Sequence, residues 1–450
     1  MSISRNPFSG EILRRFPTIS GDALREKIEG AYDAFLQWRE CSIEDRTRLL
    51  GQVGELLIEQ KESLAETITQ EIGKPIAQSR SEIEKCAWAC KFYAMQAEGF
   101  LVPREVPTEA SRSYVCYDPL GPVLAVMPWN YPFWQVFRFA APALAAGNVC
   151  LLKHAPNVWI CAARMEALFE EAGFPQGVFQ TLFIDTSEIE AVIASPKVRA
   201  VTLTGSTGAG SAVGSLCGKY LKKSVMELGG NNAVLVFPDA DMGEALKTCV
   251  EARFQNTGQS CIAGKRLLLH EAIARDFLPA LVEQVGQLIC GDPADPQTYI
   301  GVMAREDLAK TLEDQMRISL EMGAVLECGG QRKGVFFQPT ILSKVTCEMP
   351  VFREETFGPL LAVCTFSSEQ EGLKLAQDSR YGLGVSVFTE DQPRIERLVR
   401  SFDEGAIFIN SLVKSDPRLP FGGVRDSGLG RELSIEGIRE FVNIKTVYIK

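Results

Sequence analysis

The chain has 450 residues, of which 46% are hydrophobic and 23% charged, and its formal net charge is −10. This length allows two or three domains, and the negative charge argues against nucleic acid or an anionic membrane surface as the main partner. No apolar run reaches the ~18 residues of a transmembrane helix, and the N-terminus MSISRNPFSG lacks the pattern of a secretory signal. We therefore expect a cytoplasmic protein.

The sequence contains thirteen cysteines and only two histidines. An odd number of cysteines without a repeated spacing does not indicate a disulfide framework, so we expect reduced thiols that are mostly small core residues. His154 and His270 are far apart in the sequence, which argues against a Ser-His-Asp hydrolase and against a His-ligated zinc enzyme. We expect no metal centre.

The first hundred residues are predicted to be helical, with helices over 20–40, 43–72 and 76–99, because apolar residues recur there at helical spacing. From Gly121 onward, short apolar strands alternate with helices. The predicted strands are 123–127, 149–153, 200–204 and 223–228, and the predicted helices lie near 133–146, near 157–172 and from Ser206. This alternation predicts a parallel sheet with helices on both faces.

A second alternating series begins after Gly229-Gly230, where we place a hinge. Its predicted strands are 232–237, 266–270, 360–366, 384–389 and 406–410. The segment 441–450 alternates like a strand, and a strand so late in the chain is expected to pair outside its own domain. The sequence thus predicts an α/β protein with two doubly wound parallel sheets.

Cys261 lies in the polar loop of FQNTGQSCIAGKR, residues 254–266. Cysteine is usually buried among apolar residues, whereas accessible thiols in polar surroundings are the ones that can act as nucleophilic thiolates. Upstream, Glu227 stands between an apolar run and two glycines, and it is a candidate general base. A nucleophile and a base on opposite sides of a predicted domain boundary favour covalent catalysis on a carbonyl in a cleft.

Other segments have both a functional and a structural interpretation. LTGSTGAG, residues 203–210, follows a strand and could bind a pyrophosphate at a helix N-terminus, but it lacks the GxGxxG spacing and could equally be a tight connection. Asn130 in PWNYP could donate to an oxyanion or stabilise its own turn. Lys153 could contact cofactor or solvent. The acids of EETFGP (354–359) could simply be solvated. PFGGVRDSGLGRE (420–432) could be a flexible surface loop.

Taken together, MPWNYP, LTGST, MELGGNN, FQNTGQSC, EETFGP and PFGGVRDSGLGRE resemble the motifs of the aldehyde dehydrogenase superfamily in order and spacing. The resemblance covers nearly the whole chain. It implies a dinucleotide-binding domain formed by 1–101 and 120–229, a catalytic domain formed by 230–424, and a small strand-based oligomerisation element formed by 102–119 and 433–450. It also implies a homodimer or homotetramer.

The resemblance implies that Cys261 attacks the aldehyde carbon, while the Asn130 side chain and the Cys261 N–H hold the oxyanion. Hydride transfer to a nicotinamide would leave a thioester, and Glu227 would activate the water that hydrolyses it. Glu432 would belong to a proton relay. The implied cofactor contacts are Trp129, Lys153, Gly205, Ser206, Glu355 and Phe357.

Three positions depart from the family pattern. Pro156 stands where many NAD-preferring members have a glutamate, which leaves less repulsion of a 2′-phosphate, so we expect NAD or NADP as cofactor. Phe139 replaces the lysine that partners the relay, which speaks against an intact relay. Ala263 follows the nucleophile by two positions and excludes a redox switch between adjacent cysteines.

Arg138 occupies the position at which family members acting on carboxylate-bearing aldehydes also have arginine, and a guanidinium can bind a carboxylate at two points. Its structural alternative is a surface arginine on a helix. Gln255 replaces the usual second arginine. Gln135, Trp134 and the loop 412–418 are expected to complete the pocket.

The chain resembles bacterial NAD(P)-linked succinate semialdehyde dehydrogenases, which makes oxidation of succinate semialdehyde to succinate the leading hypothesis. The alternatives are a dehydrogenase of the lactaldehyde or glutarate semialdehyde type, a coenzyme A-acylating member, and a non-catalytic structural protein. Retention of Glu227 disfavours the acylating route, because that route needs no activated water.

Overall fold

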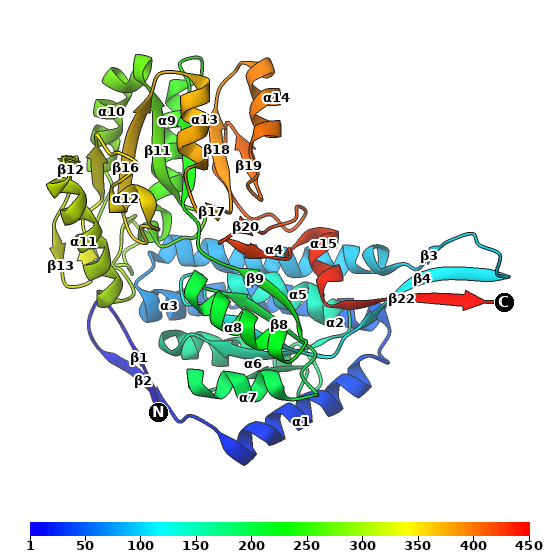
Figure 1. Ribbon diagram of the computed structural model, residues 1–450. Helices are drawn as coiled ribbons and strands as arrows, with labels where there is room; N and C mark the ends of the chain where they lie inside the picture. Colours follow the sequence, from blue (N-terminus) through cyan, green and yellow to red (C-terminus); the bar gives the residue numbers. More distant parts are fainter.

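The computed structural model describes residues 1–450 and contains two large β-sheets, each covered by helices (Figure 1). The first sheet has the strand order β21-β9-β8-β5-β6-β7, in which only β21 is antiparallel to its neighbour. Its strands are β5 (Pro122–Met127), β6 (Val149–His154), β7 (Phe179–Thr181), β8 (Ala200–Thr204), β9 (Lys223–Glu227) and β21 (Gly428–Leu429). The strand order reverses between β5 and β8, where folds of this kind bind ligands at the carboxyl ends of the strands.

The second sheet has the order β12-β15-β16-β11-β10-β18-β19, and only β12 is antiparallel to its neighbour. Its strands are β10 (Asn232–Val236), β11 (Gly264–His270), β12 (Val325–Cys328), β15 (Thr340–Ser343), β16 (Leu360–Phe366), β18 (Val385–Phe388) and β19 (Ile407–Ile409). The predicted class, an α/β protein with two doubly wound parallel sheets, is confirmed. The short strands β7, β12 and β15, of three or four residues each, were not predicted.

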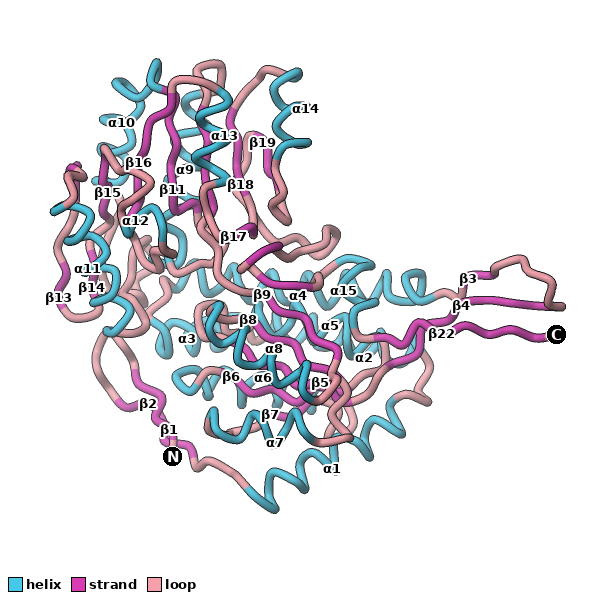
Figure 2. Tube along the Cα trace, viewed as in Figure 1, coloured by secondary structure: helices cyan, strands magenta, loops and turns pink.

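Helices cover both sheets (Figure 2). The first sheet is accompanied by α1 (Gly21–Trp38), α2 (Ile43–Glu59), α3 (Lys61–Ile72), α4 (Ile76–Leu101), α5 (Trp134–Ala145), α6 (Trp159–Glu171), α7 (Ile189–Ala194) and α8 (Thr207–Lys219). The second is accompanied by α9 (Met242–Phe254), α10 (Glu271–Gly286), α11 (Glu306–Glu321), α12 (Pro350–Arg353), α13 (Glu369–Gln377) and α14 (Gln392–Ser401). None of these helices is both long and apolar enough to cross a membrane.

Two predictions for the first hundred residues were wrong. The chain begins with a hairpin, β1 (Ser2–Arg5) and β2 (Ile12–Phe16), rather than with a helix. Most of its side chains are exposed, so the apolar alternation that marks a strand is missing. The predicted helix 43–72 is two helices, because Gln60 leaves the helical conformation with φ −93° and ψ 11° and separates α2 from α3.

A three-stranded antiparallel sheet projects from the body as an arm and carries the C-terminus (Figure 1). It has the order β22-β4-β3, with β22 (Val442–Ile449), β4 (Arg112–Pro119) and β3 (Arg104–Glu105). The last strand therefore pairs away from both large sheets, as its position in the sequence predicted. Helix α15 (Ser434–Glu440) leads into β22, which is an edge strand.

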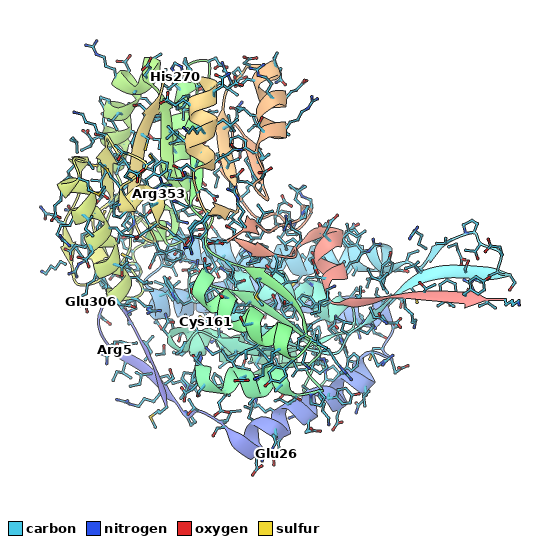
Figure 3. The ribbon with its side chains drawn as sticks, in the orientation of Figure 1. Arg5, Glu26, Cys161, His270, Glu306 and Arg353 are labelled. Carbon is cyan, nitrogen blue, oxygen red and sulfur yellow. The ribbon has the colours of Figure 1, made fainter.

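The interiors around the two sheets are separate apolar cores. The largest cluster surrounds the first sheet, and two smaller ones lie on the two faces of the second sheet. All thirteen cysteines are free, and seven of them are buried, including Cys161 within the body around the first sheet (Figure 3). Most cysteines are thus small core residues, as predicted.

The chain passes from the first sheet to the second at Gly229-Gly230, directly after β9. A side chain at Gly230 would place its Cβ 2.5 Å from the backbone oxygen of Cys261. Glycine is required here because the backbone of this connection touches the cysteine loop. The two sheets meet with the carboxyl end of β9 beside that loop.

Candidate active site

Cys261 follows a tight turn with strained backbone. The chain leaves α9 and forms a 3-10 turn in which Asn256 and Thr257 have φ angles of 55° and 53°, followed by Gly258 at 70°. Three successive left-handed residues, two of them with side chains, are rare outside functional sites. The turn brings Cys261 out of the apolar core and leaves its side chain half-buried.

The fully buried Arg253 holds this turn in place. Its Nη1 donates to the backbone oxygen of Gly258 at 3.2 Å, and its Nη2 donates to that of Thr356 at 3.1 Å. Its Nε donates to the Leu360 oxygen at 2.6 Å. One guanidinium therefore links the cysteine loop to the segment 354–360, which carries two of the predicted cofactor contacts.

Asn130 lies in the loop between β5 and α5, next to the cysteine loop. Its Nδ2 donates to the Gln259 oxygen at 3.1 Å, and its Oδ1 accepts from Gln135 Nε2 at 3.2 Å. The amide is thus fixed in orientation and retains one free hydrogen. The Cys261 backbone N–H donates no hydrogen bond within the protein. Two unused donors beside the sulfur form the kind of arrangement that binds an oxyanion.

Lys265 connects Cys261 with Glu355 beneath the site. Its buried ammonium donates to the Cys261 oxygen and to Glu355 Oε1, both at 2.8 Å. Burial raises the pKa of the Cys261 thiol, and the positive charge of Lys265 opposes this rise. The cation therefore favours the thiolate form while it also orients the Glu355 carboxylate.

Glu227 is the last residue of β9 and is 2% exposed. Neither of its carboxylate oxygens has a hydrogen-bond partner. Burial raises its pKa well above the ordinary value, and the nearby carboxylate of Glu432 raises it further. A buried carboxyl group without partners and with a raised pKa is suited to proton transfer near neutral pH.

A cavity of about 440 Å³ opens at the reversal point of the first sheet. Its walls contain every predicted cofactor contact: Trp129, Lys153, Gly205, Ser206, Glu355 and Phe357. Ser206 caps α8 by accepting a hydrogen bond from the Ala209 N–H at 3.2 Å, so the N-terminus of this helix faces the cavity. Lys153 is 6% exposed and forms neither an ion pair nor a hydrogen bond through its ammonium.

These residues fit a dinucleotide. The helix N-terminus offers positive potential to a pyrophosphate, and the unpartnered Lys153 offers a donor to hydroxyl or phosphate groups. Glu355 keeps Oε2 free of hydrogen bonds within the protein, and a Cβ at Gly229 would lie 2.6 Å from that oxygen. The wall is closed on one side by Trp129 and Phe357, whose rings meet edge to face at 5.8 Å.

A second cavity, of about 130 Å³, lies on the other side of Cys261. It is lined by the residues predicted for substrate binding, Gln135, Arg138 and Gln255, together with Trp134 and residues 412–415. Arg138 is 2% exposed and so is not the surface arginine of the structural alternative. Cys261 is in the walls of both cavities.

Arg138 forms an ion pair with Glu432, and both side chains are 2% exposed. Its Nη2 donates to Gln135 Oε1 and to Thr204 Oγ1, both at 3.2 Å, while Nη1 has no hydrogen-bond partner within the protein. Phe139 points elsewhere and packs edge to face on Phe441 at 5.2 Å. The cation beside Glu432 is therefore Arg138. It directly precedes Phe139, the residue that replaces the relay lysine of the family.

Arg253 and Lys265 were not found from the sequence. Arg253 is in the last turn of α9 and Lys265 is near the start of β11, so each resembles a solvated charge at the end of an element. The only sequence signal was that both residues lie in the stretch predicted to form the second, strongly apolar, α/β domain. Their burial is decided by the packing of 354–360 against the cysteine loop.

The fold and the two cavities define the class of protein, an α/β enzyme of the oxidoreductase type whose site lies between two doubly wound sheets. The sequence model of the aldehyde dehydrogenase family matches residues 2–447. The chain belongs to this family and is an aldehyde dehydrogenase.

Several known proteins are similar to it over nearly their whole length. A probable succinate-semialdehyde dehydrogenase [NADP(+)] from Synechocystis sp. is 43% identical over 447 residues, covering 99% of this chain and 98% of the relative. A succinate semialdehyde dehydrogenase [NAD(P)+] from Escherichia coli is 42% identical over 450 residues, covering 99% and 97%. The crystal structure of a succinic semialdehyde dehydrogenase from Streptococcus pyogenes in complex with NADP+ has a TM-score of 0.97 at 34% identity and covers 100% of both chains.

Proposed function

We propose that this enzyme oxidises succinate semialdehyde to succinate with NADP or NAD as the hydride acceptor. The observation that carries the proposal is the place of Cys261 in the walls of two cavities. One cavity has the lining expected for a dinucleotide, and the other contains a buried arginine. An aldehyde with a distant carboxylate would place its carbonyl at the sulfur and its charge in the second cavity.

In the proposed reaction, Cys261 Sγ bonds to the aldehyde carbon and the carbonyl oxygen takes up negative charge. The Cys261 N–H and the free Asn130 amide hydrogen stabilise that oxyanion, a contact typically worth ~3 kcal/mol. A nicotinamide bound in the larger cavity would supply the acceptor for the hydride ion that leaves this carbon, and the acyl group would remain on the Cys261 sulfur as a thioester. Glu227 then takes a proton from the attacking water, the carbon–sulfur bond breaks, and succinate leaves.

Glu227 lines neither cavity in its buried position. The Glu227 side chain must therefore change its rotamer to reach a water molecule beside the thioester. The neighbouring residues Leu228 and Gly229 are in the wall of the larger cavity, so a rotation of the Glu227 side chain would carry its carboxylate toward that cavity. A base that is withdrawn while the cofactor cavity is filled leaves space for the nicotinamide beside the sulfur.

The choice of substrate and cofactor is supported by the relatives and by single residues. The relatives from Synechocystis sp. and Escherichia coli are named for succinate semialdehyde and for NADP(+) or NAD(P)+. Arg138 offers a free Nη1 to a carboxylate. Pro156 lines the cofactor cavity and brings no negative charge to it, which permits a 2′-phosphate.

We also infer that the three-stranded arm, β22-β4-β3, assembles the enzyme into a homodimer or homotetramer. Its edge strand β22 exposes Ile444, Tyr448 and Ile449 by 62%, 56% and 45%. An unpaired edge with apolar side chains is a template for another strand. We further propose the domain limits that the family resemblance implies. Residues 1–101 with 120–229 bind the cofactor, residues 230–424 form the catalytic domain, and residues 102–119 with 433–450 form the assembly element.

The proposal is tested with a steady-state panel of succinate semialdehyde, lactaldehyde, glutarate semialdehyde and the uncharged pentanal, each with NADP and with NAD. We expect the highest kcat/KM for succinate semialdehyde. Cys261→Ala should form no NADPH from any aldehyde while it still binds the cofactor, measured by fluorescence. Cys290→Ala, at an exposed thiol, is the matched control and should have full activity.

Arg138→Ala should raise KM for succinate semialdehyde far more than KM for pentanal. An equal effect on both aldehydes would show that the arginine does not recognise the carboxylate. Turnover by Cys261→Ala would remove the covalent mechanism, and an equal kcat/KM for pentanal in the wild-type enzyme would remove the proposed substrate class.

A further inference from the structure

A second cation lines the substrate cavity from a part of the chain that the sequence motifs do not cover. Lys85 lies on α4, and its side chain contributes to the same walls as Arg138 and Cys261. Its Nζ donates to Ser415 Oγ at 2.8 Å and lies 4.3 Å from the centre of the Trp134 ring. Trp134 Nε1 donates to the same hydroxyl at 3.0 Å, so the ammonium is held in one place by two residues of the cavity wall.

Lys85 has no carboxylate partner, unlike the other lysine of this region. Lys74, which is 1% exposed, forms an ion pair with Glu82, and Glu82 also accepts hydrogen bonds from the first backbone N–H groups of α5. Asp416 in the loop, whose charge acts on Lys85, is paired with Arg418. Both acids near Lys85 are therefore occupied, and no carboxylate lies within 4.0 Å of its ammonium.

The charges of the cavity consequently do not balance. Glu82 is matched by Lys74, and Arg138 is matched by Glu432. The ammonium of Lys85 is therefore the unpaired positive charge of the cavity. The exposed Lys414 contributes a further positive charge to the cavity wall. A half-buried ammonium without a counter-ion is costly unless a negative ligand supplies one.

We propose that Lys85 is a specificity-determining residue that binds the substrate carboxylate together with the free Nη1 of Arg138. This inference rests on the proposed function and extends it, because it assigns the second cation of the carboxylate site. In the family pattern the second cation is an arginine a few residues before the nucleophilic cysteine. This chain has Gln255 at that position. Gln255 lines the cavity but has no charge, and Lys85 on α4 supplies a positive charge to the same cavity.

The protonation of Lys85 is consistent with this role. Burial and the neighbouring Arg138 lower the pKa of Lys85 to about 8, while Cys86, Glu82 and Asp416 oppose this shift. A bound carboxylate would act in the same direction as those groups and keep the ammonium charged. Without such a ligand the lysine is partly neutral near pH 8, which reduces the repulsion between it and Arg138.

The test compares Lys85→Met, which keeps the stem of the side chain over Trp134 but removes the charge, with Lys85→Arg, which keeps the charge. Lys91→Met is the matched control, because Lys91 is on the same helix but exposed. KM and kcat are measured for succinate semialdehyde and pentanal, and the dissociation constant of succinate is measured by titration calorimetry without turnover.

For Lys85→Met we expect KM for succinate semialdehyde and the dissociation constant of succinate to rise about ten- to a hundredfold, the range expected for a lost hydrogen bond to a charged group. The KM for pentanal and both kcat values should stay within about twofold of the wild type. Lys85→Arg should recover most of the loss, and Lys91→Met should behave as the wild type.

An equal change for both aldehydes would show a structural role and overturn the inference, as would an unchanged KM for succinate semialdehyde. If the wild-type enzyme prefers succinate semialdehyde and Lys85→Met retains that preference, only the role of Lys85 fails. If the wild-type enzyme shows no preference for the charged aldehyde, the proposed substrate class and the role of Lys85 fail together.

Discussion

Arg138 on α5 and Glu432, which follows β21, form a buried ion pair that joins two segments almost three hundred residues apart. Glu432 is in turn the strongest charged influence on the pKa of Glu227. The arginine that faces the substrate cavity thus also sets the charge next to the proposed base. In the proposed mechanism, substrate recognition by Arg138 and proton transfer by Glu227 would therefore share one electrostatic network.

Glu432→Ala should destabilise the protein strongly, because it leaves the buried Arg138 charge without its partner, a loss of ~3–5 kcal/mol for pairs of this kind. Thermal denaturation should give a lower midpoint for Glu432→Ala and for Arg138→Ala. The double variant should lose less than the sum of the two single losses. Simple additivity would mean that the two side chains do not interact in solution.

Glu227→Gln should stop turnover but retain the first hydride transfer. The amide cannot take a proton from water, and the loss of a positioned base typically costs ~10²–10⁴-fold in rate. We expect one burst of NADPH per active site in a stopped-flow experiment, followed by a slow steady state. Absence of the burst would show that Glu227 is needed before the thioester forms.

The same variant should change the dependence of activity and stability on pH. Burial raises the pKa of Glu227 well above its ordinary value of 4.5, so turnover should fall as the pH falls through this raised value, because the base becomes protonated. The folded state binds this proton more tightly than the unfolded state, so the stability that it contributes is present below pH ~4.5 and is lost as the pH rises through the folded pKa.

Glu227→Gln should therefore melt at a higher temperature than the wild type at a pH above the folded pKa of Glu227, and the difference should shrink toward pH 4.5. Thermal scans at several pH values, with the cofactor absent, measure this. A constant difference at every pH would mean that the variant acts through packing and not through the proton.

Pro156→Glu should shift the cofactor preference toward NAD. The new carboxylate would line the cofactor cavity and repel a 2′-phosphate, while the ribose hydroxyl of NAD can donate to it. We expect KM for NADP to rise about tenfold or more at constant ionic strength, with a much smaller change for NAD. Pro156→Gln controls for the loss of the ring, and an equal rise in the control would assign the effect to the backbone.

If the arm forms the proposed homodimer or homotetramer, removal of residues 442–450 should give monomers, because β22 is the edge strand of the arm. Light scattering coupled to gel filtration measures the mass. Ile444→Lys with Tyr448→Lys is the milder variant, since it adds charge to exposed side chains of β22 and leaves its pairing with β4 intact. A wild-type enzyme that is already monomeric would contradict the role of the arm.

Most of the fold could be predicted because the central strands of both sheets are continuous apolar runs. The predicted limits of β16 agree with the structure, and those of β8 do as well. The prediction of secondary structure failed where the sequence shows no clear difference between buried apolar and exposed polar positions. In the hairpin of β1 and β2 only Ser4 and Phe16 are buried, and the separation of α2 from α3 depends on one backbone angle pair at Gln60.

The candidate site was predictable to the extent that its residues lie in distinctive local surroundings. Cys261 is conspicuous in a polar loop, and Asn130 stands between rigid neighbours. Lys85, Arg253 and Lys265 were not found, because a charged residue on a helix or at the start of a strand is usually solvated. Their roles depend on which element packs against them.

The amino-acid sequence by itself determined the strands and helices, the polar loop around Cys261 and the order of the motifs, because these follow from local composition and periodicity. Only the tertiary structure decided which charges are neutralised. It pairs Arg138 with Glu432 and leaves Lys85 facing the cavity without a counter-ion. Ion pairing depends on distances between residues remote in the chain, and those distances exist only once the two sheets have packed.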